Sequence, residues 1–322
     1  MLNSTAATIN GTPTSAGSFP VTVTATNSIG TGTAIVTIVI APFGFSHIVN
    51  FSARALSGSG SDTLIVGFAV SGNGKNLLVR GIGPSLALFN ISNFLAAPIL
   101  TLYNSDGSIE AMNSGWEVSS SGQDQGVLIA ATAASVGAFP LQANSLDSAL
   151  LVTVDNGEHT SSLLTSNGAS GVGLIEIYDT GGNPFASLTN VSARMNVTSG
   201  DGVLIAGFVI GGNASKTVLV RGIGPTLSEF GVKGVLPDPQ IVVLSGTNPL
   251  ASNSNWGSGT NTPAQISAAS ALVGAFPLPA GSMDAALLIT LPPGIYTVQV
   301  TSLRNNNGVA LIEVYDVSQG SQ

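Results

Sequence analysis

Charged side chains are the first candidates for chemistry in this sequence, because so few of its residues carry a charge. Only 7% of the 322 residues are charged, whereas about 25% are charged in a typical soluble domain. Many strings around these charges occur twice along the chain, as in LLVRGIGPSLAL and VLVRGIGPTLSE. The charges that keep their place in both copies include Arg54 and Arg194, Arg80 and Arg221, Asp147 and Asp284, and Glu176 and Glu313.

Two of these charges lie inside strongly apolar stretches, Arg80 in NLLVRGI and Glu176 in GLIEIYD. A single buried charge is too unfavourable to persist, so we predict a structural ion pair in each copy. In the first copy the candidate cations are Arg54 and Arg80. The candidate carboxylates are Asp147 and Glu176, and an arginine fork can bind either through two hydrogen bonds. The matching candidates in the second copy are Arg194, Arg221, Asp284 and Glu313.

A functional alternative uses the same carboxylates. Asp147 and Glu176 would then form an acid–base pair that faces an open cleft. The two interpretations differ in what surrounds the carboxylates, since an ion pair needs a cation and catalysis needs access to substrate.

The string RGIGP contains Gly-x-Gly after an apolar stretch, as nucleotide-binding loops do. The third glycine of the G-x-G-x-x-G pattern is replaced by Leu86 in the first copy and by Leu227 in the second. The surrounding sequence also lacks the strand–helix–strand unit that such a loop needs. We therefore interpret RGIGP as a tight turn closed by proline.

Two tryptophans recur in matching polar loops, Trp116 in NSGW and Trp256 in NSNW. An exposed indole at these positions is a candidate glycan-binding platform, because its flat face can stack on a sugar ring. The other interpretation is that each indole caps the hydrophobic core.

Residues suited to catalysis or metal binding do not recur in the two copies. His47 and His159 have no counterparts in the second copy, cysteine is absent, and no G-x-S-x-G string is present. The turn NSDGS at 104–108 has one carboxylate, and its counterpart SGTNP has none, which argues against a calcium loop. The sequence therefore predicts no catalytic residues, no metal and no cofactor.

The charge balance excludes two classes of partner. The net charge is −8 with only 8 Lys plus Arg, so we expect neither nucleic acid nor an anionic lipid surface to bind. The longest uncharged stretches are too polar to span a membrane. A Thr-, Ser-, Asn- and Gly-rich chain without cysteine favours an extracellular or cell-surface location. The start, MLNSTAATIN, does not read as a secretion signal, so we expect any leader to be absent from this sequence.

The recurring strings show a tandem duplication whose unit is the size of a whole domain. Each copy contains several short apolar runs separated by Gly, Asn, Ser and Pro, as in TLIVGFAV and NLLVRGI, which predicts β-strands. One short helix is expected in each copy, at 263–276 and near 125–137. We predict an all-β fold with two tandem β-sandwich, jelly-roll-like domains at 43–180 and 181–322.

Residues 1–42 belong to neither copy. The string INGTPTSAGSFPVTVTATNSIGTGTA resembles the C-terminal half of putative immunoglobulin-like domains of bacterial surface proteins. Such a sandwich needs about 7 strands and 100 residues, so a partial module is expected here. It must pack on the first copy, receive strands from another chain, or be preceded by a first half that this sequence lacks.

The duplicated unit as a whole also resembles a known module. Strings such as VLVRGIGPTL and GVALIEVYD are similar to tandem repeats in large extracellular proteins of Verrucomicrobia-like bacteria, over residues 47–317. The last third of the unit is distantly similar to bacterial pre-peptidase C-terminal domains. The resemblance implies an extracellular location and β architecture, and it implies no catalytic activity.

Together these features predict a non-catalytic extracellular structural protein. The specific hypothesis is a filament or surface-layer subunit that self-associates head-to-tail, with strands of one subunit completing the N-terminal segment of the next. The alternative is a carbohydrate-binding or adhesin module with glycan as its partner.

Overall fold

The structure is a computed structural model that describes residues 2–3, 8–9, 15, 17–40, 46–165, 167–198 and 202–317. The prediction of an all-β fold is confirmed, and the pairings between the strands are antiparallel. Strands such as β6 (Leu64–Ser71) alternate between buried and half-buried residues, as expected for strands with one face on a core.

The first copy supplies eight strands and one α-helix. These are β5 (Ser46–Ser57), β6, β7 (Lys75–Ile82), β8 (Pro98–Tyr103), β9 (Ile109–Asn113), α1 (Gly126–Ser135), β10 (Ser148–Val154), β11 (Gly157–Thr165) and β12 (Gly171–Gly182). They pair in the orders β5-β12-β7-β10 and β6-β11-β8-β9. Two four-stranded rows connected in this way form a jelly roll.

The second copy repeats the same arrangement. Its elements are β13 (Ser187–Val197), β14 (Leu204–Gly212), β15 (Lys216–Ile223), β16 (Pro239–Ser245), β17 (Asn248–Asn253), α2 (Pro263–Leu272), β18 (Ala285–Leu291), β19 (Gly294–Ser302) and β20 (Gly308–Asp316). The pairing orders are β13-β20-β15-β18 and β14-β19-β16-β17. The duplication therefore produced two jelly rolls, each with the short helix that the sequence predicts.

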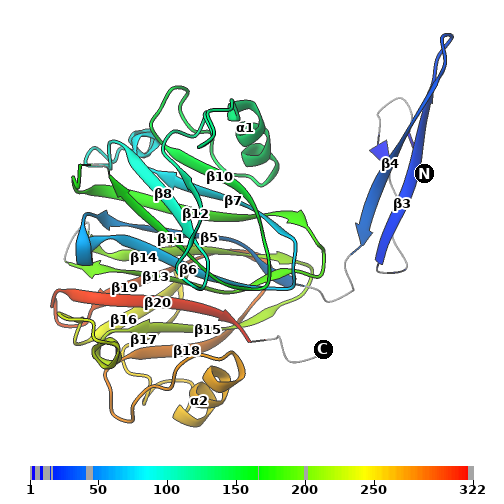
Figure 1. Ribbon diagram of the computed structural model, residues 1–322. Helices are drawn as coiled ribbons and strands as arrows, with labels where there is room; N and C mark the ends of the chain where they lie inside the picture. The colour runs from blue at the N-terminus through cyan, green and yellow to red at the C-terminus, as the bar shows by residue number, and fades with distance from the viewer. Residues whose placement is uncertain are drawn as a thin grey trace.

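The two jelly rolls are joined strand to strand (Figure 1). Strand β5 of the first pairs with β14 of the second, and β13 of the second pairs with β6 of the first. All the strands of both copies thus belong to one 16-stranded sheet system. Phe51 lies opposite Phe208 at the junction, and one cluster of buried apolar residues runs through both copies.

Small residues allow the close approach at this junction. A Cβ added to Gly207 would lie 2.6 Å from the hydroxyl of Ser52, and one added to Gly67 would lie 2.8 Å from that of Ser192. Each serine belongs to one copy and each facing glycine to the other. These serines and glycines lie in strings that recur in the two copies, FSAR at 51–54 and VSAR at 191–194, VGF at 66–68 and AGF at 206–208. The close approach at the junction explains why both copies keep them.

The two helices cover the outer faces of the sheets at opposite ends of the molecule (Figure 1). Helix α1 packs on β7 and β10, and α2 packs on β15 and β18. Helix α2 begins with Pro263 after a Thr262–Gln265 capping box. Its predicted extent to residue 276 was too long, because Gly274 takes a left-handed conformation with φ 70° and ends the helix.

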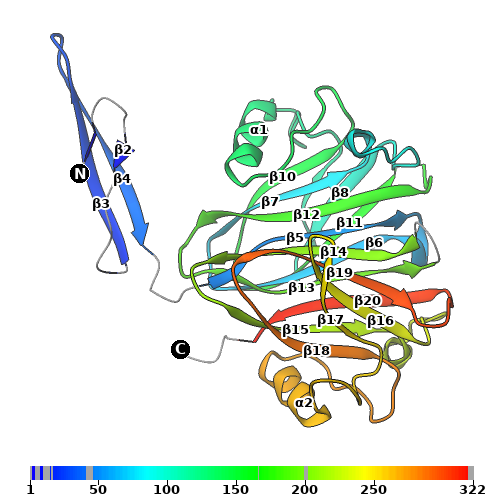
Figure 2. The same ribbon diagram turned by 180° about the vertical axis from the view of Figure 1, so that it is seen from behind.

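The N-terminal residues form a hairpin that stands apart from the jelly rolls (Figures 1 and 2). Strand β3 (Gly17–Thr26) pairs with β4 (Thr31–Ile40), and the short β1 (Leu2–Asn3) pairs with β2 (Thr8–Ile9). The pairs Phe19–Ile38, Val21–Val36 and Val23–Ala34 place apolar side chains on one face. That the segment belongs to an immunoglobulin-like module stays a prediction.

The joined sheets predict how one copy behaves alone. Expressed as residues 46–182, it loses the partners of β5 and β6 and exposes core residues such as Phe51 and Phe68. We expect a dimer in which β5 of one molecule pairs with β6 of the other, measured by size-exclusion chromatography with light scattering. A folded monomer as stable as the parent chain would show that the copies are independent.

Candidate functional site

The first candidate is the charged cluster on the outer face of β7 and β12, where Arg80 and Glu176 lie opposite each other. Arg80 is fully buried and Glu176 is 6% exposed. The Nε and Nη2 atoms of Arg80 both donate to Glu176 Oε2, at 2.8 and 2.5 Å. Arg80 Nη1 donates to the carbonyl of Phe139 at 2.7 Å. Of the two candidate arginines, Arg80 therefore forms the buried ion pair, and its partner is Glu176.

Aromatic rings complete the environment of this guanidinium. The Arg80 Cζ atom lies 4.5 Å from the ring centre of Phe139 and 5.7 Å from that of Tyr178. Both distances suit cation–π attraction. Leu78 and Ile82 lie on either side of Arg80 along β7, and each is buried in a different apolar cluster. The ion pair is thus a polar spot inside a layer that covers the sheet.

The second copy builds the same cluster. Arg221 Nε lies 2.8 Å from Glu313 Oε2, and Arg221 Nη1 donates to the Phe276 carbonyl at 2.7 Å. Burial raises the pKa of the Tyr315 phenol and of the Glu313 carboxyl. The neutral phenol donates to Glu313 Oε1 at 2.8 Å, which satisfies the oxygen that faces away from the arginine.

Asp147 has a different role from the one we predicted. Its oxygens accept from the Gly83 N–H at 2.8 Å and from the hydroxyls of Ser85 and Ser145 at 2.5 and 2.6 Å. It is fully buried and ties the RGIGP turn to the segment before β10. Asp284 holds Gly224 and Thr226 in the same way. The prediction of Asp147 as an ion-pair partner was wrong, because backbone and hydroxyl donors satisfy it.

The acid–base interpretation is not supported by these surroundings. Asp147 and Glu176 are 0% and 6% exposed, and donors within the fold occupy both. Neither carboxylate faces an open cleft, so substrate has no access to the pair.

The RGIGP turn owes its second glycine to a close contact. An added Cβ at Gly83 or Gly224 would collide with the carbonyl oxygen of Leu95 or Leu236. The Gly83 N–H that a phosphate loop would offer to a ligand is already bonded to Asp147. The turn interpretation therefore has a concrete basis.

Two lysine–aspartate pairs were not foreseen from the sequence. Lys75 Nζ lies 2.7 Å from Asp179 Oδ2, and Lys216 Nζ lies 2.6 Å from Asp316 Oδ2. Burial opposes ionisation of Asp179, but hydrogen bonds from His47, Lys75 and the Gly181 N–H lower its pKa overall. Matching lysines and aspartates at the ends of two strings were the signal that could have revealed these pairs.

The tryptophans are structural. Trp116 and Trp256 are each 6% exposed, and they pack in the apolar clusters under α1 and α2. Each indole N–H donates to a backbone carbonyl, of Gln142 in the first copy and Pro279 in the second. At this exposure neither indole forms an open platform for a sugar ring, so the interpretation of the two tryptophans as glycan-binding residues was wrong.

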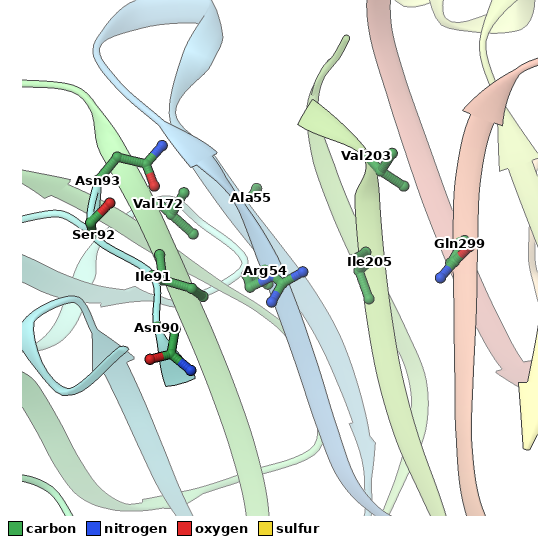
Figure 3. Close-up of a pocket in the computed structure, with 10 residues that line it drawn as sticks. All are labelled: Arg54, Ala55, Asn90, Ile91, Ser92, Asn93, Val172, Val203, Ile205 and Gln299. Carbon is green, nitrogen blue, oxygen red and sulfur yellow. The ribbon is translucent and has the colours of Figure 1, made fainter. Parts of the chain in front are cut away.

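Arg54 lies in a surface groove where the two jelly rolls meet (Figure 3). It is exposed on the outer face of β5, between the buried Ala53 and Ala55. The groove has a volume of about 350 Å³ and is lined by Arg54, Ala55, Asn90, Ile91, Ser92, Asn93, Val172, Val203, Ile205 and Gln299. The prediction that Arg54 could serve as the buried cation was wrong, since Arg54 is exposed on its strand whereas the segment with Phe139 covers Arg80.

Arg194 occupies the equivalent position on β13. It lies in a second groove of about 350 Å³ with Ile65, Gly67, Thr160, Ser192, Leu227, Phe230, Val232, Phe276 and Leu311. The fold thus brings together six of the eight predicted charges as ion pairs or turn ties, and it places the remaining two, Arg54 and Arg194, in paired surface grooves.

Within the described residues, no group of three or more His, Cys, Asp or Glu side chains has the arrangement of a metal site. In the same part of the chain, no helix has the length and apolar character needed to cross a membrane. His159 stacks on Phe68 and contacts Glu110 at 3.1 Å, in the place that Tyr296 takes in the second copy beside Phe208.

Comparison with known proteins gives little. No protein-family model matches this chain, and no curated protein sequence matches it. Among solved structures, the major capsid protein P2 from bacteriophage PM2 is similar over 86% of this chain and 100% of that chain, with 9% identity and a TM-score of 0.20. The fold assignment rests on the strand pairings above and not on this similarity.

Removing the Asp147 carboxylate should destabilise the first jelly roll. In the Asp147→Ala variant the buried Gly83 N–H and Ser85 hydroxyl lose their acceptor, so we expect the free energy of unfolding to fall by about 3 kcal/mol. Chemical denaturation measures this loss. The exposed Glu158→Ala variant is the control and should match the parent. Equal stability of the two variants would contradict the role given to Asp147.

The Arg80–Glu176 pair should show strong coupling in a double-mutant cycle. Arg80→Met leaves Glu176 buried without a partner, which costs about 3–5 kcal/mol. Adding Glu176→Leu should recover part of that loss. A second cycle with Arg304→Met, in an exposed turn of the second copy, and Glu176→Leu is the control, and its effects should add within about 0.5 kcal/mol. Additive effects in the Arg80 cycle would rule out the pair as a unit.

Proposed function

We propose that this chain is a non-catalytic structural protein of an extracellular assembly, in which a neighbouring copy covers the N-terminal hairpin. The observation that carries the proposal is the uncovered apolar face of β3 and β4. Phe19 is 40% exposed, and Val36 is 45% exposed. In a folded sandwich, side chains at such paired positions lie against a second sheet.

The physical argument concerns what a lone hairpin lacks. A two-stranded hairpin is marginally stable in water without a covering layer. Among the described residues no further strand pairs with the outer edges of β3 and β4, and free edges favour the addition of another strand. Strands from a second copy would supply both the cover and the backbone partners, and a contact that joins different surfaces of the two copies extends into a filament.

The sequence composition supports the same proposal. Few charges and many apolar residues suit a chain that hides part of its surface against other copies. The carboxylates that looked suited to catalysis are occupied by structural partners, which supports a non-catalytic role. The expected extracellular location rests on the sequence resemblance alone.

Assembly can be tested with one variant on each face of the hairpin. Val21→Asp charges the apolar face, and Thr24→Asp, the control, charges the opposite face at a position paired with Thr33. We expect the parent chain and Thr24→Asp to form larger species with rising concentration, and Val21→Asp to remain monomeric. Size-exclusion chromatography with light scattering and negative-stain electron microscopy measure this. A monodisperse parent chain at every concentration would reject the proposal.

The alternative function is carbohydrate binding. The buried tryptophans do not support carbohydrate binding, whereas the polar side chains of the groove around Arg54 do.

A further inference from the structure

Cations are scarce in this chain, which has only 8 Lys plus Arg, so each cation without an ion-pair partner is a notable feature. Four of them, Lys75, Arg80, Lys216 and Arg221, form buried ion pairs. Arg54 forms no ion pair with any carboxylate in the described part of the chain, and the same holds for Arg194.

The position of Arg54 is not required by the core. Its neighbours Ala53 and Ala55 point inward and are buried, whereas Arg54 points outward into the groove. The duplication has nevertheless kept an arginine at this place on both β5 and β13. A cation kept twice, exposed at Arg54 and half-buried at Arg194, with no ion-pair partner among the described residues, suggests an anionic ligand.

The groove around Arg54 combines several recognition elements (Figure 3). Strand β5 supplies the guanidinium, and the loop at 90–93 supplies amide and hydroxyl side chains on one side. Gln299 of β19 adds another amide from the second jelly roll on the other side. Ile205 and Val203 provide an apolar strip between them. The volume of about 350 Å³ lies at the lower end of the range for small-molecule sites.

We propose that this groove binds an acidic saccharide. The Arg54 guanidinium matches the planar geometry of a carboxylate or the oxygens of a sulfate group. The amides of Asn93 and Gln299 and the hydroxyl of Ser92 suit the ring hydroxyls, because they can both donate and accept hydrogen bonds. Ile205 contacts the apolar face of the sugar ring. The site exists only where the two jelly rolls meet, since each contributes one wall.

The duplicated groove around Arg194 explains why the first is the saccharide site. The counterpart of Asn90 in the second copy is Gly231, which has no amide, and the second groove is lined there by Phe230 and Val232. The second groove keeps the cation but loses the amide side chains that bind hydroxyls. The side chains that line each groove beside the arginine therefore determine which ligand it can bind.

The negative net charge of the chain means that an anionic saccharide can bind only through local contacts in the groove. The chain carries a net charge of −8, which repels an anionic saccharide at long range. Binding must then come from the groove itself and not from a general attraction of polyanions to a basic surface.

Isothermal titration calorimetry tests the proposal with three probes: trigalacturonate, its methyl ester, which lacks the charges, and a chondroitin sulfate tetrasaccharide. We expect the parent chain to bind at least one of the two acidic probes, and to bind the methyl ester at least tenfold more weakly than trigalacturonate if it binds the latter. Arg54→Gln should weaken binding at least tenfold, and Gln299→Ala severalfold. Arg304→Gln removes the same charge from an exposed turn and should bind like the parent.

Two outcomes would overturn the proposal. One is a parent chain that binds neither acidic probe. The other is an equal loss of affinity in Arg54→Gln and Arg304→Gln, which would indicate unspecific electrostatics. The assembly-defective Val21→Asp variant should bind as the parent does, so this proposal and the assembly proposal fail separately.

Discussion

The pairing of β5 with β14 and of β13 with β6 is the constraint on which the rest of the structure depends. A jelly roll whose β5 and β6 edges were free would leave rows of backbone N–H and C=O groups unpaired, and would open its core to water. The duplicated unit resolves this by pairing each edge with the other copy. One continuous core results, and the grooves at Arg54 and Arg194 lie on the outer faces of this junction.

The outer faces of the sheets form a second organised layer. Arg80 and Glu176 lie between two apolar clusters, one under α1 and one under the turn that follows RGIGP. Asp147 ties that turn to the segment before β10. Such buried charges add less to stability than apolar residues of the same size would, but removing one partner is strongly destabilising. The buried charges determine which segment packs on which strand, and this explains why both copies kept them.

A jelly roll by itself does not indicate a function, because this fold serves many unrelated activities. Two features are left unsatisfied within the described residues: the apolar face of the N-terminal hairpin, and Arg54, which has no ion-pair partner there, in the groove between the copies. The first favours assembly with another copy, and the second favours an acidic ligand. The two features lie in different parts of the chain and are independent of each other.

Sequence alone determined the duplication, the β-strands, the short helices and the set of recurring charges, because alternation, turn residues and repeats are local properties. It left open which arginine meets which carboxylate, because Arg54 and Arg80 both recur in the second copy and no local pattern shows which one lies beside Glu176. Only the tertiary structure decided this: strand pairing places Arg80 opposite Glu176 and under the segment with Phe139, and it leaves Arg54 exposed at the junction. The pairing of strands between the two copies, the burial of Trp116 and the groove around Arg54 likewise depend on contacts between residues far apart in the sequence, which no local pattern encodes.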